Sequence, residues 1–414
     1  MIIFNRITSA ILLATNSYPL FDSLWNRVLF LLGFFYAGLA PVQAQHTSSF
    51  DWDVHSSQEI WLANISTNEV GTENISNTFK PVWLNYTGSS ISHSWSFNHD
   101  ISLDSYLSAF YTNGSSISEY VGELQSISNI EASTGVELLE AWFTLGLSGT
   151  LQIKSGILDS NADFDSIEPA QFFINPSHGI GPDFSSVGMS GPSIFPETGL
   201  GAIIFYGTDN WSLKLGGFDP TPHTPSANNN LSELYQWRVD DGALLVSEFI
   251  INVSAIHFGV GLWGSSYDQT LIYSEFDNLK NARGFYGYVH RNDTFGSTYL
   301  RLGVSESSTA YIDRYVGAGW VKKLNVEHPS FSENYVGISL ASARLGELGY
   351  YSEFGTEIGS SMVHPFEHIV ELSSISTMFD HFTIQPNLQM ILQPGARTQD
   401  TSHFLLGLRG TWEL

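Results

Sequence analysis

The feature that most constrains the fold of this chain is an alternation of apolar and polar side chains that runs to its last residue. In the final segment one parity is apolar or aromatic, and it comprises Phe404, Leu406, Leu408, Gly410, Trp412 and Leu414. The other parity is polar apart from Leu405, and it comprises His403, Gly407, Arg409, Thr411 and Glu413. A period of two is typical of a β-strand whose two faces meet different environments.

The preceding segment repeats this separation. Its apolar parity comprises Phe382, Ile384, Pro386, Leu388, Met390 and Leu392, and its polar parity Thr383, Gln385, Asn387, Gln389 and Gln393, with Ile391 as the exception. Shorter alternating segments cover residues 151–154, 211–216, 256–263 and 298–305. Every Lys and Arg in these segments lies on the polar parity. Because a charge facing lipid costs about 2–4 kcal/mol at the membrane midplane, this segregation predicts one lipid-facing and one water-facing side.

The number of such strands favours an all-β transmembrane barrel over two stacked sheets. After Ala44 no stretch shows a convincing helical period, and Gln125–Leu147, which comes closest, is interrupted by Gly135 and Gly146. Only 14% of the residues are charged and another 14% are aromatic, a mixture that suits aromatic girdles around an apolar belt. We predict one antiparallel barrel over residues 45–414 with about 16 strands, since each strand and its connection use roughly 20–25 residues. The polar segments Asn74–Thr78 and Thr221–Asn230 are predicted to be loops.

The N-terminal region predicts export. Arg27 precedes the apolar run Val28–Ala40, which is too short to span a bilayer as a helix, and small residues at Val42 and Ala44 suit cleavage after Ala44. Residues 1–44 are therefore predicted to be a signal peptide region. Because Met1 lies far upstream of Arg27, we expect that translation begins near residues 24–28.

Charge and composition exclude several classes of protein. The chain carries 16 Lys+Arg and 41 Asp+Glu, a formal net charge of −25, whereas nucleic-acid binding needs clustered basic residues. It has no cysteine, as exported chains can. The 13 His show no metal-binding spacing, and no Gly-x-Ser-x-Gly elbow is present. We therefore expect no catalytic residues, no metal site and no cofactor.

Several ordered motifs resemble those of the carbohydrate-selective porins, the outer-membrane porin B family. They begin with the stretch Tyr120–Ala132 and the acidic-aromatic strand Leu138–Phe143. They continue through Lys154–Phe164, Gln171–Ile180 and Asp241–Glu248, and end with Gln385–Gln389 and Gly407–Arg409. The resemblance runs from about Ser94 to Leu414. Residues 46–90 show no clear match, and the chain ends in Leu414 where the family usually has an aromatic residue.

This resemblance implies a passive diffusion channel for small neutral sugars in the bacterial outer membrane. Expected partners are outer-membrane lipid, lipopolysaccharide and the barrel-assembly machinery, with the channel as a monomer or a trimer. A general porin, or one for organic acids or amino acids, would share every barrel feature. A secreted soluble β-rich protein, such as an adhesin or a lectin, would share only the signal peptide.

The polar parity and one loop supply candidate pore-lining residues. Sugar passage requires hydrogen-bonding groups, aromatic faces and weak binding. We expect the stretch Lys154–Asn175 to form the constriction, as a strand end that leads into a loop folded inward. Lys154 and Arg301 are the candidate bases, and Glu140 and Glu248 the candidate acids. The remaining candidates for sugar contact are Asp159, Asn161, Asp163, Phe164, Glu168, Phe173, Asn175, Gln385, Asn387 and Gln389.

Overall fold

We describe the structure from a computed structural model of the chain. It covers residues 47–68, 75–98, 100–187, 191–222, 237, 242–266, 269–270, 279–325, 331–354, 365–378, 381–397 and 402–414. Thr47–Leu414 forms one compact unit. The predicted signal peptide, its cleavage site and the proposed later start lie outside the described residues, so these remain predictions.

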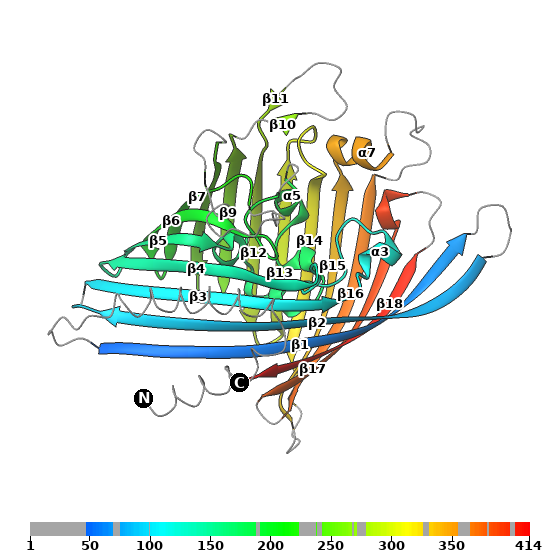
Figure 1. The fold of residues 1–414 in the computed structure, drawn as a ribbon, viewed down its shortest axis with the longest axis horizontal. Coiled ribbons are helices and arrows are strands. Elements are labelled where there is room, and N and C mark those ends of the chain that lie inside the picture. The colour runs from blue at the N-terminus through cyan, green and yellow to red at the C-terminus, as the bar shows by residue number, and fades with distance from the viewer. Residues whose placement is uncertain are drawn as a thin grey trace, which may run out of the picture. The chain divides into compact units, whose positions relative to one another are not determined.

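Sixteen strands of the described part close into an antiparallel barrel, as predicted (Figure 1). Each strand pairs with its neighbours in the sequence, and β1 pairs with β18 to close the sheet. The strands are β1 (Thr47–Asn68), β2 (Ile75–Ser96), β3 (Ile101–Gly114), β4 (Gly135–Leu147), β5 (Leu151–Leu158), β6 (Gly199–Thr208), β7 (Trp211–Phe218), β8 (Leu244–Val253), β9 (Ile256–Ser265), β12 (Arg283–Asp293), β13 (Gly296–Ser305), β14 (Ile312–Lys323), β15 (Phe331–Leu345), β16 (Phe366–Met378), β17 (Phe382–Leu392) and β18 (His403–Glu413). Two further strands, β10 (Gln269–Thr270) and β11 (Leu279–Lys280), pair only with each other.

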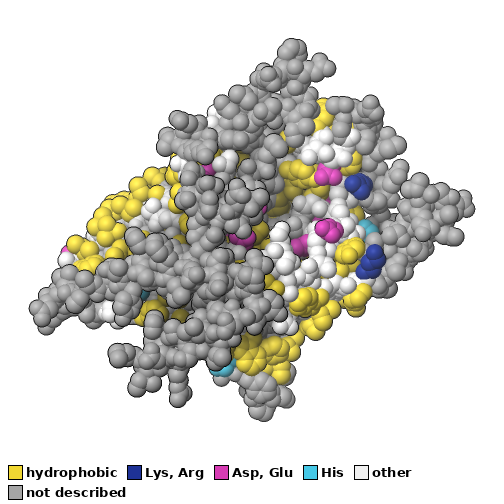
Figure 2. Space-filling model, in the orientation of Figure 1, with side chains coloured by type: hydrophobic (Ala, Val, Ile, Leu, Met, Phe, Trp, Pro, Cys, Tyr) yellow, Lys and Arg dark blue, Asp and Glu magenta, His cyan; other side chains and the backbone are white. Residues whose placement is uncertain are grey.

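The alternation in the sequence corresponds to the two faces of the barrel wall. On β13, Leu300 and Leu302 are 41% and 50% exposed, whereas Arg301 between them is only 3% exposed. The same holds on β18, where Leu406 and Leu408 lie on the outside. Hydrophobic side chains accordingly cover much of the described outer surface that Figure 2 shows. A lipid-facing exterior follows from this separation.

Helices are short in this molecule. They are α3 (Ser118–Val121), α4 (Ser160–Asp163), α5 (Pro182–Ser185) and α7 (Glu347–Phe354), with 3₁₀ turns η2 (Glu168–Phe172), η3 (Pro176–His178) and η6 (Pro394–Ala396). Among the described helices, none is long and apolar enough to cross a bilayer. The segment Gln125–Leu147, which was closest to a helical period, is irregular until β4 begins at Gly135.

Two long connections pack against the inner face of the barrel wall. We call residues 115–134, between β3 and β4, the first inner loop. We call residues 159–187 and 191–198, the described part of the connection between β5 and β6, the second inner loop. They meet where the Asn175 side-chain amide donates to the Ser126 carbonyl (2.7 Å) and the Asn129 N–H donates to the Ile174 carbonyl (3.0 Å). The connections at the opposite strand ends include two-residue turns such as Ser254–Ala255.

The inner loops explain the two exceptions to the alternation. Leu405 and Ile391 stand on the inward parity and are fully buried. They belong to an apolar cluster that also contains Ile127 and Ile130 of the first inner loop and Ile174 of the second. The inside of the barrel is therefore partly an apolar core rather than a wholly hydrophilic wall, because the loops are held by burying hydrocarbon as well as by hydrogen bonds.

One predicted loop was wrong. Ile75–Thr78, within the predicted loop Asn74–Thr78, forms the beginning of β2 and pairs with β1 in register. The polar composition of this segment suggested a loop, but pairing with a neighbouring strand overrides local propensity. Of the other predicted loop, Thr221 and Pro222 lie outside any helix or strand, and residues 223–230 are not among those described.

Candidate functional site

The predicted constriction begins with a cluster of charges on the inner face of β4 and β5. The Lys154 ammonium lies 2.8 Å from the Asp163 carboxylate and 3.8 Å from that of Glu140. It also lies 4.3 Å from the ring centroid of Trp142, whose indole N–H donates to Glu140 (3.2 Å). A cation over an indole face is stabilised by the ring quadrupole. Three of the predicted pore-lining residues, Lys154, Glu140 and Asp163, are thus brought together.

The second inner loop leaves β5 through a capped turn. The Asp159 carboxylate accepts from the Asn161 N–H (2.8 Å) and so caps α4, and it also accepts from the Phe195 N–H (3.3 Å). The Asn161 side-chain amide donates to the carbonyls of Phe164, Asp165 and Gly179. These two side chains therefore shape the loop, and both stay partly exposed.

An aromatic pair that sequence reasoning missed lies beside this cluster. The rings of Tyr106 on β3 and Trp142 on β4 stack with centroids 5.2 Å apart and planes 24° apart. Both residues are half-buried, in contrast to the fully buried aromatics of the apolar clusters. Trp142 lies within the recognised strand Leu138–Phe143, so its inward parity with Glu140 could have identified it.

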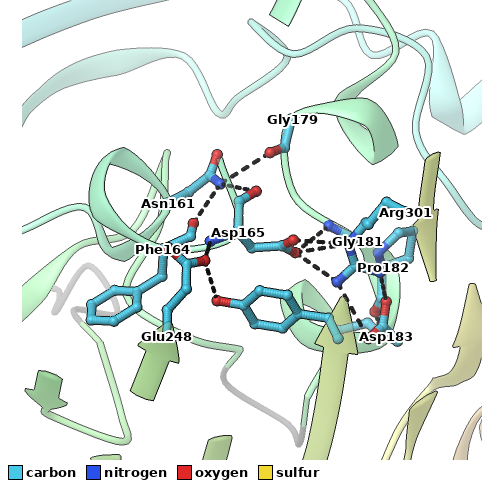
Figure 3. Close-up of polar contacts among 11 residues, drawn as sticks. Asn161, Phe164, Asp165, Gly179, Gly181, Pro182, Asp183, Glu248 and Arg301 are labelled. Atoms are coloured by element: carbon cyan, nitrogen blue, oxygen red, sulfur yellow. Dashed lines mark hydrogen bonds and ion pairs between the residues drawn. The ribbon is translucent and has the colours of Figure 1, made fainter. Parts of the chain in front are cut away.

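On β8, Glu248 is a centre of hydrogen bonding rather than an exposed acid. It is 1% exposed, accepts from the Asp165 N–H (2.9 Å) and the Tyr286 hydroxyl (2.8 Å), and pairs with Lys214 (3.1 Å). The Lys214 ammonium also donates to the Asp163 carbonyl. Glu248 thus connects the wall to Asp165 of the second inner loop (Figure 3). Its partner Lys214 also reaches Asp163 of the Lys154 cluster.

Arg301 on β13 holds the middle of the second inner loop. Its guanidinium pairs with Asp165 (2.6 Å) and with Asp183, and both carboxylates are fully buried (Figure 3). The guanidinium lies between the rings of Tyr286 and Tyr315, 5.3 and 5.2 Å from their centroids. A side chain at position 181 would overlap this guanidinium. The loop backbone can pass this close to Arg301 because residue 181 is a glycine.

A third group joins the loop to β16 and β17. The Glu371 carboxylate accepts from the backbone N–H groups of Ile174 (2.8 Å) and Asn175 (3.0 Å) and from the Asn387 amide (2.5 Å). The Gln385 amide donates to the Phe172 carbonyl (2.9 Å), and the Gln389 amide to the Ile127 carbonyl (2.9 Å). Of the predicted polar residues, Gln385 and Gln389 therefore bind loop backbone directly, and Asn387 binds the Glu371 carboxylate that does so.

The remaining predicted residues lie in different settings. Phe164 and Phe173 are buried, Phe164 against Phe218 and Phe173 against Phe172. Glu168 is exposed and accepts from the Asn292 amide (3.2 Å). The structure thus groups the predicted residues into anchors of the loop and a partly exposed set beside Lys154. Their contact with sugar remains a prediction.

Four acids important to this arrangement were not predicted. Glu371 shares the inward parity of β16 with Glu367, which accepts from the N–H groups of Leu124 and Gly395 (2.8 Å each). The alternation along β16 could have identified both. Asp165 lies in irregular backbone, and Asp183, which joins it in the Arg301 group, lies in the four-residue helix α5. No periodic pattern in the sequence distinguishes either.

Glu123 in the first inner loop predicts a pH dependence of stability. Burial raises the pKa of its carboxyl to about 7, and both carboxylate oxygens are buried without a hydrogen-bond partner. Because the folded pKa lies above the unfolded value, this group stabilises the fold most below pH 4.5, and the contribution is lost as the pH rises through 7. We expect the free energy of unfolding to fall by about 3 kcal/mol between pH 4.5 and 8 on this account.

Urea unfolding of the purified protein at pH 5 and pH 8 measures this effect. Glu123→Gln should reduce the difference in unfolding free energy between the two pH values by about 2–3 kcal/mol. Glu119→Gln, which changes an exposed acid of the same loop, should keep it. An equal pH dependence in Glu123→Gln and the wild type would show that Glu123 is not responsible.

Comparison with known proteins supports both the fold and the motifs. Residues 102–255 match the model of the carbohydrate-selective porin, OprB family, which confirms the resemblance inferred from the sequence. The structure described as the high-pH structure of Pseudomonas putida OprB superposes with a TM-score of 0.70 at 15% identity, covering 88% of this chain and 94% of that one. At this identity the likeness shows the fold. No curated protein matches the chain by sequence.

Two further solved structures are similar at a lower level. The low-pH structure of Pseudomonas putida OprB has a TM-score of 0.47 at 12% identity, covering 88% of this chain and 92% of that one. A mutant of the Rh. blastica porin has a TM-score of 0.48 at 8% identity, covering 88% of this chain and all of the other.

Proposed function

We propose, from the match to the carbohydrate-selective porin family, that this chain lets sugars diffuse passively across the bacterial outer membrane. A porin is a channel, not an enzyme. The side chains that line it need only surround a water-filled path and bind the passing sugar weakly. The closed barrel with its apolar exterior places the chain in the outer membrane.

The observation that carries the sugar assignment is the stacked pair Tyr106–Trp142 beside polar groups. Its half-buried rings lie next to Lys154, Glu140 and Asp163. A pyranose ring presents C–H groups on its faces and hydroxyls at its edge. The aromatic pair can therefore contact a sugar face while the carboxylates accept from its hydroxyls. Because several of these polar groups are already paired with one another, each contact with a sugar would be weak enough for release.

Swelling of liposomes that contain the purified protein tests this function. We expect monosaccharides to enter faster than organic acids or amino acids of similar size. Equal rates for all three classes would support the alternative of a general porin. Faster entry of organic acids or amino acids would instead support a channel selective for those solutes.

The aromatic pair itself is tested by Trp142→Ala. In planar bilayers, we expect the sugar concentration that halves the ionic current to rise about threefold to tenfold, because a stacking contact of this kind contributes about 0.5–1.5 kcal/mol. Phe143→Ala changes the neighbouring aromatic residue, which is 50% exposed on the outside of the barrel, and should leave this concentration unchanged. An unchanged value for Trp142→Ala would exclude the pair from the sugar path.

The proposal extends to export and assembly. Cleavage after Ala44 would release a mature chain whose first barrel strand begins at Thr47. Outer-membrane lipid and lipopolysaccharide would surround the apolar belt, and the barrel-assembly machinery would insert it. N-terminal sequencing of the protein from outer membranes tests the cleavage site.

A further inference from the structure

We propose that the inner face of the barrel wall binds a divalent transition-metal ion between His257 on β9 and His290 on β12. The two histidines are register partners on adjacent strands. Their imidazole rings stack with centroids 4.4 Å apart and planes 6° apart. Both lie on the inward parity, since His257 adjoins Phe258, which is 45% exposed on the outer face, and His290 shares the parity of the buried Tyr288. Neutral imidazole is a common metal ligand, so this pair can chelate an ion.

The hydrogen bonds around His257 leave one of its ring nitrogens ready to bind a metal. The Asn252 side-chain amide donates to the Asp209 carbonyl (2.7 Å), so the Asn252 Oδ1 atom is an acceptor. The Nδ1 atom of His257 lies 2.7 Å from that oxygen and therefore donates its proton to it. The Nε2 atom then carries a lone pair, and among the described residues no side chain or backbone group donates to it. Histidines that bind metals usually donate their other ring nitrogen to an oxygen in this way.

Two further acceptor atoms beside His257 lack partners. His290 is only 8% exposed, and its Nδ1 atom is buried without a hydrogen-bond partner. Asn292, two residues along β12 on the same face, donates its side-chain amide to the Glu168 carboxylate (3.2 Å). That bond orients the amide, and its Oδ1 atom is also buried without a partner. Because buried polar atoms in folded proteins are nearly always satisfied, these two atoms indicate a ligand that both can bind.

The chemistry of this group suits Zn²⁺, Cu²⁺ or Ni²⁺, which prefer imidazole ligands. The Glu168 carboxylate adds a negative charge next to Asn292. Within the described part of the chain, no three His, Asp or Glu side chains could hold a metal by themselves. The third protein ligand is therefore the Asn292 amide oxygen, and water completes the coordination. Two nitrogens of a tetrahedral zinc site lie about 3.4 Å apart, so the stacked rings need to approach by about 1 Å, which rotation about the soft ring torsion permits.

The site lies near the short-turn end of the barrel. β9 begins at Ile256, directly after the turn Ser254–Ala255, and His257 is half-buried. Glu168 is the first residue of η2, so an ion bound here would join the second inner loop to the wall through Asn292. The expectation of no metal site rested on spacing along the chain. It did not detect this pair, because only the register of β9 and β12 brings the two histidines together.

Calorimetric titration with Zn²⁺ tests the site, on protein prepared without a polyhistidine tag and freed of metal with EDTA. We expect one Zn²⁺ per chain. The Kd should rise more than about 100-fold in His257→Ala and in His290→Phe, which keeps a stacked ring but removes its nitrogens. Asn252→Ala removes only the acceptor that orients His257 and should raise the Kd about tenfold. His381→Ala, which changes an exposed histidine of another turn, should leave the Kd unchanged.

Electron paramagnetic resonance with one equivalent of Cu²⁺ identifies the ligands. The wild type should show nitrogen couplings from two imidazoles, and His257→Ala those from one. Heat-modifiable gel mobility shows that each variant is folded, and none of these measurements depends on sugar passage. A wild type that binds no stoichiometric Zn²⁺, or a Cu²⁺ spectrum without imidazole nitrogen, would overturn the proposal. So would the same Zn²⁺ affinity in the wild type and both histidine variants.

Discussion

Replacing Arg301 with Ala is expected to release the second inner loop from the barrel wall and to destabilise the protein by about 3–5 kcal/mol. The guanidinium is 3% exposed and pairs with two fully buried carboxylates, those of Asp165 and Asp183. Without it, two negative charges remain in a poorly solvated site. The loop then has no ion pair to β13. Asp165 also donates its N–H to Glu248, so the displaced charge of Asp165 weakens the attachment of the loop to β8 as well.

Planar-bilayer recordings and urea unfolding together measure this outcome. We expect a larger single-channel conductance and a lower unfolding midpoint than in the wild type. Arg283→Ala is the matched control, because that side chain is 78% exposed and its pair with Glu306 contributes about 0–1 kcal/mol. If Arg301→Ala and Arg283→Ala behave alike, the buried ion pairs do not hold the loop.

A compensating variant separates charge from packing. Arg301→Met combined with Asp165→Asn and Asp183→Asn removes all three charges while keeping most of the volume. Since replacing a whole buried ion group is far less costly than removing one member, this variant should recover most of the stability lost in Arg301→Ala. Failure to recover would mean that the geometry of the guanidinium, and not its charge balance, is what the loop requires.

Replacing Glu371 with Leu is expected to destabilise the protein by about 2–5 kcal/mol and to loosen the contact between the two inner loops. The carboxylate accepts from two consecutive backbone N–H groups, those of Ile174 and Asn175. Leucine leaves both donors buried and unsatisfied, and each such group costs about 1–3 kcal/mol. Asn175 is also the residue whose side-chain amide reaches the first inner loop at Ser126.

Limited proteolysis of the folded protein detects this change. We expect new cleavage within the second inner loop of Glu371→Leu, together with a lower urea midpoint. Glu333→Gln, which changes an acid paired with Lys323 on an exposed part of β15, is the control and should resemble the wild type. A protease-resistant second inner loop in Glu371→Leu would contradict the anchoring role.

The sequence located the wall residues correctly because alternation is local. The inward positions of Lys154, Arg301 and Gln385 follow from neighbours one and two residues away, and each is 6% exposed or less. The same reasoning gave the barrel and its sixteen strands. Alternation did not identify the partners of these residues. An inward polar side chain produces the same sequence pattern whether it faces water or a loop folded into the barrel.

What the sequence determined by itself is therefore the barrel and the two faces of its wall, because lipid and water sort side chains with the period of the strand. What the tertiary structure decided is the filling of the barrel. Arg301 and Asp183 are 118 residues apart, and Ile174 and Glu371 are 197 residues apart, in segments that share no repeat. Contacts of irregular backbone at such separations depend on where each loop folds back, and only the three-dimensional packing fixes that.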